Sequence, residues 1–230
     1  MVRHEGNPAS PYRAVVTGDV VQSTRLSSQK FKDVQEIIRH ASDDVAQFFP
    51  DRAPFPIEVF RGDSWQLLVT DPTDALRIAL FLRAYLRADA KRVDTRISIG
   101  VGTIDTQPTH AVGEGRGEAF RLSGELLDKK SASRMRFAMT KGHTDAWWQE
   151  RSLATLLSVL DLIILRWTSA QALAVRGALV GWKQERIAET WPGGAITQQA
   201  AGQHLARAGW DGVREAVAYY EEIMRKWISA

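Results

Sequence analysis

The sequence contains no cysteine. Disulfide bonds, thiolate metal sites and cysteine nucleophiles are therefore excluded. Long apolar runs are also absent, because the longest, residues 157–165, contains Asp161 and is far shorter than the roughly 20 residues that span a bilayer. Residues 1–13 lack the apolar stretch of a secretory signal peptide. These absences predict a soluble, cytoplasmic protein that does not associate with a membrane.

A strong charge bias is missing as well. The formal net charge is only +3. Residues 1–143 carry 21 Lys and Arg against 18 Asp and Glu, whereas residues 144–230 carry nine of each. Because neutralisation of phosphates supplies most of the affinity of a DNA-binding protein, a neutral C-terminal region weakens the case for a DNA partner.

Residues 1–143 alternate between strand-like and helix-like patterns. Strand patterns cover residues 13–21, the two halves of 57–70 around a Gly-Asp turn, 95–104 and 134–140. Helical spacing or helix-start signals cover residues 28–49, 71–90 and 117–129. The order β-α-β-β-α-β-α-β predicts an α+β fold of ferredoxin-like (split βαβ) type, with an antiparallel sheet and helices on one face.

The composition changes near residue 143. Seven of the eight tryptophans follow this point, and strand signals stop. We therefore predict two domains, a ferredoxin-like domain over residues 1–143 and an all-α domain over residues 144–230. Within the second, residues 197–227 have the pattern of two helices separated by Gly209, which resembles a helix-turn-helix unit.

Gln198, Gln199 and Arg214 are the candidate DNA contacts of that unit. Asp211 and Glu215 offset the positive charge beside them, so the segment fits an oligomerisation domain equally well. The second helix also carries an apolar series that is long for a recognition helix and indicates a buried or partner-facing stripe: Val213, Ala216, Val217, Tyr220, Ile223, Met224 and Trp227.

Two aspartates of the first domain are expected to meet. In the split βαβ topology the first strand lies beside the third, so Asp19 near the end of the first strand faces Asp63 in the hairpin. Two bare carboxylates would repel, and a Mg²⁺ or Mn²⁺ ion removes that cost. The peptide nitrogens of residues 20–24, at a helix start, suit phosphate oxygens. The alternatives are a helix cap for Asp19 and a turn role for Asp63.

Four motifs in order resemble the class III nucleotide cyclases. They are "DVVQST", "RGDSWQLLV", "RISIGVG" and "GEAFRLSGELL". The first resembles the family's Asp-Ile-Val-Gly-Phe-Thr signature, and the third its Arg-x-Gly-Ile-x-x-Gly strand. The chain is more similar to the SatD family, a small bacterial group in which a cyclase-like domain precedes a helical, helix-turn-helix-like segment.

The resemblance implies a site for a nucleoside triphosphate in a homodimer, because cyclase sites form between two chains. Asp19, Asp63 and the backbone carbonyl of Val20 would ligate Mg²⁺ or Mn²⁺. The residues that would line or contact the phosphates are Gln22, Ser23, Thr24, Arg61 and Arg116.

Two other positions depart from the family pattern. The transition-state Asn and Arg of cyclases align with Arg121 and Glu125, so Arg121 is the remaining candidate catalytic residue. The base-selecting Lys aligns with Val59. The residues that would bind metal are thus retained, while those that would select the base and stabilise the transition state are changed. We interpret the chain as a metal-dependent, nucleotide-responsive regulator. The alternative is an active cyclase that makes a cyclic nucleotide and releases pyrophosphate.

Overall fold

Five strands form one mixed sheet. The computed structural model describes residues 10–60, 62–90, 93–140 and 146–229. The strands are β1 (Tyr12–Val20), β2 (Glu58–Phe60), β3 (Ser64–Val69), β4 (Thr95–Thr103) and β5 (Met135–Met139). They lie in the order β2-β3-β1-β4-β5, and all neighbours are antiparallel except β4 and β5. The first strand lies beside the third, as predicted.

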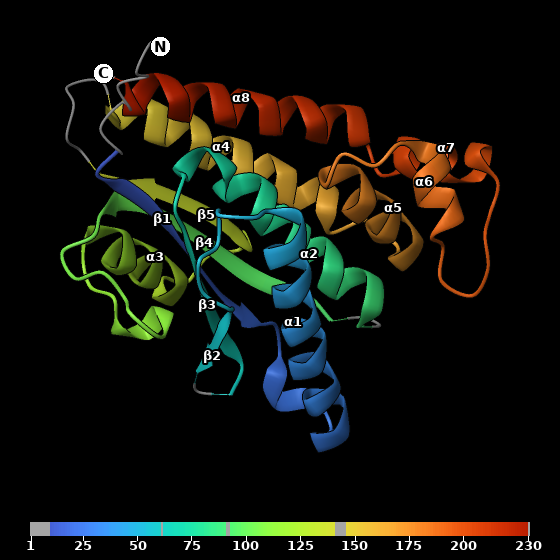
Figure 1. Cartoon of the computed structure of the whole chain (residues 1–230), viewed down its shortest axis with the longest axis horizontal. Coiled ribbons are helices and arrows are strands. Elements are labelled where there is room, and N and C mark those ends of the chain that lie inside the picture. The colour runs from blue at the N-terminus through green and yellow to red at the C-terminus, as the bar shows by residue number, and fades with distance from the viewer. Residues whose placement is uncertain (1–9, 61, 91–92, 141–145, 230) are drawn as a thin grey trace, which may run out of the picture.

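Helices make up the rest of the regular structure (Figure 1). Three belong to the first part of the chain: α1 (Ser28–Phe48), α2 (Ala75–Asp89) and α3 (Glu118–Asp128). Five follow: α4 (Ala146–Ile164), α5 (Ser169–Leu179), α6 (Gln184–Glu189), α7 (Gln198–Arg207) and α8 (Trp210–Ile228). Short 3-10 turns are η1 (Ser23–Arg25), η2 (Pro72–Asp74) and η3 (Val112–Glu114). Each predicted helix of the first part is present within a few residues of its predicted bounds.

Local chemistry explains where several helices begin. The Ser27 side chain accepts a hydrogen bond from the Lys30 N–H at the start of α1. Thr168 and Gln171 form a reciprocal capping box at the start of α5. Gly209 takes φ +71° between α7 and α8, a conformation that costs glycine little. The predicted turn between the last two helices is therefore confirmed.

The two faces of the sheet carry different chemistry. Ala14 and Val16 of β1 point into the main hydrophobic core, with α1, α2, α4 and α8. Val15 belongs to a small second cluster on the other face, with Ala119 of α3. Thr17 and Asp19 follow Val15 on this second face, because side chains alternate along a strand. The polar end of β1 thus lies on the α3 side of the sheet.

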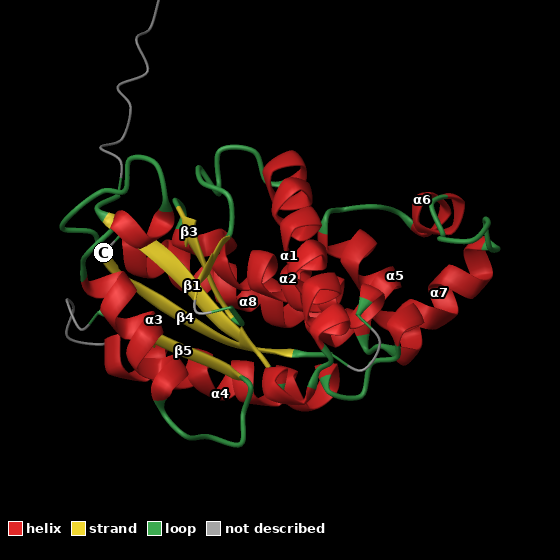
Figure 2. Ribbon diagram, turned by 90° about the horizontal axis from the view of Figure 1, so that it is seen from below, coloured by secondary structure: helices red, strands yellow, loops and turns green. Residues whose placement is uncertain are grey.

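Helix α3 lies close against β4, β1 and β5 (Figure 2). A Cβ atom at Gly100 would lie 2.5 Å from both the Ala119 carbonyl oxygen and the Ser123 nitrogen, so glycine is what permits this approach. Thr17 Oγ1 donates to Ser123 Oγ at 2.9 Å across the same interface. The sequence predicted helices on one face only, and these small residues account for the additional layer.

The helices after residue 146 share the main core with the sheet. Leu153 and Leu157 of α4, Val175 of α5 and Trp227 of α8 all belong to the same buried cluster as β1. Figure 1 shows α8 running alongside α4, while α5, α6 and α7 lie beyond one end of the sheet. The predicted domain boundary falls at 141–145, outside the described residues, and it does not separate two hydrophobic cores.

Helix α8 buries the apolar stripe that the sequence singled out. Its buried members are Val213, Ala216, Val217, Tyr220, Met224 and Trp227, while Ile223 is half-buried. Tyr220 donates its hydroxyl to the Pro72 carbonyl at 3.1 Å, and Glu221 pairs with Arg77 of α2 at 2.6 Å. The stripe therefore packs within the chain. Across the described ranges, no helix combines the length and the apolar character needed to cross a membrane.

The close approach of α3 gives a prediction about two glycines. Gly100→Ala should lower the free energy of unfolding by about 1–3 kcal/mol, because the added methyl group must push α3 off the sheet. Gly124→Ala in α3 is the matched control: a Cβ there meets nothing within 4 Å, so it should raise stability by about 0.5–1 kcal/mol. Urea unfolding of both variants measures this, and equal stabilities would contradict the packing.

Candidate functional site

The backbone places Asp19 and Asp63 close to each other at the end of β1. Asp19 is opposite Ser64 of β3, and the Val20 N–H donates to the Asp63 carbonyl at 3.0 Å. Gly62 precedes Asp63 with φ +86°, which also supports the turn role proposed for this Gly-Asp pair. The backbone is thus arranged as the sequence implied, but the two carboxylates have different partners.

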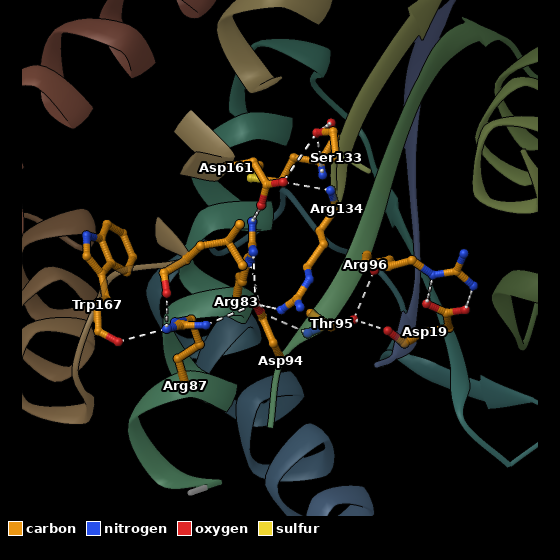
Figure 3. A network of polar contacts seen from close by, with 12 residues as sticks. Asp19, Arg83, Arg87, Asp94, Thr95, Arg96, Ser133, Arg134, Asp161 and Trp167 are labelled. Atoms are coloured by element: carbon orange, nitrogen blue, oxygen red, sulfur yellow. Dashed lines mark hydrogen bonds and ion pairs between the residues drawn. The ribbon is translucent and has the colours of Figure 1, made fainter. Parts of the chain in front are cut away.

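The Asp19 carboxylate is held by Arg96 from β4, the residue opposite it in the strand register. Arg96 Nε donates to Asp19 Oδ1 at 2.7 Å, and Nη2 donates to Oδ2 (Figure 3). The Asp19 side chain is 15% exposed and that of Arg96 38%. The hydrogen bond to Asp19 raises the pKa of the Arg96 guanidinium. Arg96 is the first residue of "RISIGVG", and no sequence pattern assigned it a role.

The Asp63 carboxylate turns toward the loop after β1. Ser23 Oγ donates to Asp63 Oδ2. Ser23 begins the short turn η1, and Gln22 before it adopts a left-handed conformation with φ 57°. Gln22 and Thr24 are exposed. The predicted phosphate-contacting segment is therefore a tight turn tied to the hairpin through one serine.

A metal ion between the two aspartates does not fit this arrangement as it stands. Each carboxylate oxygen of Asp19 accepts a hydrogen bond from Arg96, and Asp63 is engaged by Ser23. Residues 10–60, 62–90, 93–140 and 146–229 contain no group of three or more His, Cys, Asp or Glu placed to hold a metal. Metal binding would require the guanidinium to leave Asp19.

The remaining predicted cations are scattered. Arg121 is exposed on α3 and pairs with Glu125 at 3.0 Å and Glu118 at 3.7 Å on its own helix. Arg116 donates to the Gly113 and Gly115 carbonyls, at 2.7 Å each. Arg61 lies outside the described residues. The structure therefore does not bring Arg121 to Asp19 through any described contact.

A polar cleft of about 470 Å³ lies on the α3 side of the sheet. Thr17 and Gln66 form part of its floor and are joined by a hydrogen bond of 3.0 Å. Ser64, opposite Asp19, also lines it, so the cleft adjoins the Asp19–Arg96 pair. Arg116 contributes one wall.

A second guanidinium lies near Arg96. Arg136 of β5 donates to the Leu126 and Lys129 carbonyls at the end of α3. Burial and the neighbouring charge of Arg96 both lower the pKa of Arg136, while the charge of Asp19 raises it. Arg96 and Arg136 adjoin the cleft without lining it, and the charges of Asp19, Asp63 and Asp128 all act on Arg96. Glu58 and Asp128 line the cleft together with Arg116, so an anionic ligand would meet carboxylates as well as guanidinium groups.

A buried network of charged side chains lies next to this site (Figure 3). Arg83 of α2 is fully buried and donates to both oxygens of Asp94, at 2.9 Å each. Its third nitrogen, Nη1, lies 2.6 Å from Asp161 Oδ1 of α4. Arg87 and Arg134 add further contacts to Asp94 Oδ2, at 2.9 and 2.7 Å.

The network continues to the backbone of Asp19. Asp94 Oδ1 accepts from the Thr95 N–H at 2.9 Å, and Thr95 Oγ1 donates to the Asp19 carbonyl at 2.7 Å. Burial by itself would raise the pKa of Asp94, but the hydrogen bonds and charges of Arg83, Arg87 and Arg134 outweigh it and lower that pKa. The only signal of this network in the sequence was Asp161 inside an apolar run.

The predicted DNA contacts take no part in the described contacts of this network. Gln198 and Gln199 are exposed at the start of α7. Arg214 on α8 lies 3.4 Å from Asp211 and 3.8 Å from Glu215. These acidic partners reduce the positive charge available to a phosphate backbone, and DNA binding stays a prediction.

Comparison with known proteins gives structural matches only. No protein-family model matches the sequence, and no curated protein matches it either. The chain is similar to the guanylate cyclase domain of RhGC from Catenaria anguillulae in complex with GTP, at 14% identity, 61% coverage of this chain, 82% of that chain and a TM-score of 0.46. It is also similar to the guanylyl cyclase Cya2, at 16% identity, 50% and 68% coverage and a TM-score of 0.39. Both matches are guanylate cyclases.

The buried network predicts a large effect of removing Arg83. Arg83→Met should lower the free energy of unfolding by about 3–5 kcal/mol, because Asp94 and Asp161 would lose a buried partner. Arg39→Met is the control, since the Arg39–Glu36 pair is 65% and 64% exposed and should contribute less than about 1 kcal/mol. Urea unfolding compares them. A loss under 1 kcal/mol for Arg83→Met would contradict the role of the network.

Proposed function

We propose that the polar cleft on the α3 side of the sheet binds a nucleotide, and that the chain is a cyclase-like, nucleotide-responsive regulator. The observation that carries the proposal is a cleft with Arg116, Thr17 and Gln66 in its lining. Two further guanidinium groups, Arg96 and Arg136, lie beside its Ser64 end. A phosphate group would meet the guanidinium groups, and the sugar or base would occupy the space over Thr17 and Gln66.

The order of elements agrees with this proposal. The strand order β2-β3-β1-β4, with β1 antiparallel to both neighbours, supports the ferredoxin-like class predicted from the order of strand and helix patterns. Membership of the SatD family, a homodimer and a DNA-binding role for α7 and α8 rest on the sequence and belong to the same proposal.

Binding without turnover is the favoured form of the proposal. Arg96 occupies the Asp19 carboxylate, which would otherwise bind metal. Arg121 pairs with Glu118 and Glu125 of its own helix and so has no described contact with the cleft. Val59 stands where a cyclase carries its base-selecting Lys. An active cyclase remains the alternative, and the appearance of a cyclic product discriminates between them.

The test titrates the protein with each of the four common nucleoside triphosphates by calorimetry, once with Mn²⁺ and once with EDTA. At least one should bind in EDTA, because Arg96 and Arg136 supply positive charge without a metal. Arg96→Gln should weaken that binding about tenfold or more, since hydrogen bonds to charged groups contribute about 1.5–3 kcal/mol. Arg39→Gln, on the other side of the sheet, should leave it unchanged.

Three outcomes decide between the forms of the proposal. Absence of binding by any nucleotide, with or without Mn²⁺, would refute nucleotide recognition. Binding that strictly requires Mn²⁺ would restore the predicted metal site at Asp19 and Asp63. Release of pyrophosphate with a cyclic product would show that the chain is an active cyclase and not a regulator that only binds the nucleotide.

A further inference from the structure

A second cavity lies on the opposite side of the sheet from the cleft. It has a volume of about 260 Å³ and is bounded by α1, α2, α5 and the α6 region. Phe48, Phe81, Trp182 and Trp191 are the aromatic side chains around it. The cavity thus joins the sheet-covering helices to the C-terminal helices, and nothing in the proposed nucleotide site involves it.

The aromatic rings around the cavity meet edge to face. The Phe48 and Trp182 ring centres are 5.6 Å apart with an interplanar angle of 85°, and those of Phe48 and Phe81 are 6.3 Å apart at 64°. Gly177 of α5 is needed for this arrangement, because a Cβ there would lie 3.0 Å from Trp182 Cε3 and 2.9 Å from Ile187 Cγ1. Aromatic faces carry negative potential, so these walls favour a positive guest.

The cavity lining carries one carboxylate, Asp44, and one cation, Arg176. Asp44 of α1 lines it and accepts a hydrogen bond from the Tyr85 hydroxyl. Burial, followed by the charge of Asp44, raises the pKa of Tyr85 to about 12, so this hydroxyl stays a neutral donor. Arg176 also lines the cavity, but it pairs with Asp89 at 2.6 Å and lies 4.2 Å above the centre of the Tyr85 ring. The charge left over is that of Asp44.

One wall already attracts a cation from within the chain. The Arg186 guanidinium lies 5.6 Å from the centre of the Trp182 ring. Arg186 is exposed, with Glu189 3.7 Å away, and it does not line the cavity. Arg186 therefore already lies over one face of the Trp182 ring, outside the cavity.

We infer that this cavity binds a small organic cation, a quaternary ammonium or protonated amine, between the aromatic walls and Asp44. Cation–π attraction and the carboxylate act on the same charge, and a cavity of this volume holds a small molecule. The bound cation would contact α1, α2 and α5 at once, and so would stabilise the junction between the two parts of the chain.

The test uses choline and its neutral isostere 3,3-dimethyl-1-butanol on the full chain. Choline should bind about tenfold more tightly than the alcohol, because only the charge differs. Binding is followed by NMR on the indole N–H signals of Trp182 and Trp191, each assigned through its Phe variant. The exposed Trp147 and Trp148 on α4 serve as internal controls for non-specific contact.

Asp44→Asn should bring the affinity for choline down toward that of the alcohol. Asp43→Asn is the matched control, since Asp43 is the exposed neighbour on the same helix and does not line the cavity. Equal affinity for the two probes, no shift at Trp182 and Trp191, shifts confined to Trp147 and Trp148, or an unchanged choline affinity in Asp44→Asn would each overturn the inference.

Discussion

The arrangement of the chain depends on the ion pairs that the Arg83 guanidinium makes. This guanidinium is fully buried between Asp94 and Asp161, which are themselves 5% and 1% exposed. Burying three charges is unfavourable unless every partner is in place, so α2, the start of β4 and α4 are fixed relative to one another. Arg87 and Arg134 bring further donors to Asp94 from α2 and from the segment before β5. The C-terminal helices are in this way joined to the sheet by charge as well as by the shared apolar core.

Helix α2 connects this network to both candidate binding sites. Arg83 belongs to the network, whose hydrogen bonds continue from Asp94 through Thr95 to the Asp19 carbonyl. Asp19 lies beside the polar cleft. Phe81 and Tyr85, on the same helix, belong to the aromatic cavity and its charged rim. A ligand that shifted α2 at the cavity would act on elements that also hold the end of β1. The two sites lie on opposite sides of the sheet, but both depend on the position of α2.

The sequence predicted local structure well because apolar spacing and turn residues act over short distances. The strand and helix order of the first part, the Gly209 turn and the buried stripe of α8 are all confirmed. It did not predict the partner of Asp19, because Arg96 lies 77 positions away and meets it only through the register of β1 and β4. Pairing of a charge across strands depends on register, which no single segment encodes. The shared core could not be predicted for a related reason, because a change of composition near residue 143 does not encode which distant segments pack together.

The central claim is that the sheet and the helices from residue 146 onward form one cooperative unit. Differential scanning calorimetry of the full chain tests this most directly, with far-ultraviolet circular dichroism and tryptophan fluorescence recorded over the same temperatures. Seven of the eight tryptophans lie after residue 143, so fluorescence reports mainly on the helices. The account predicts a single transition with coincident midpoints and a calorimetric enthalpy equal to the van't Hoff enthalpy. Two separated transitions, with fluorescence following only one of them, would contradict it.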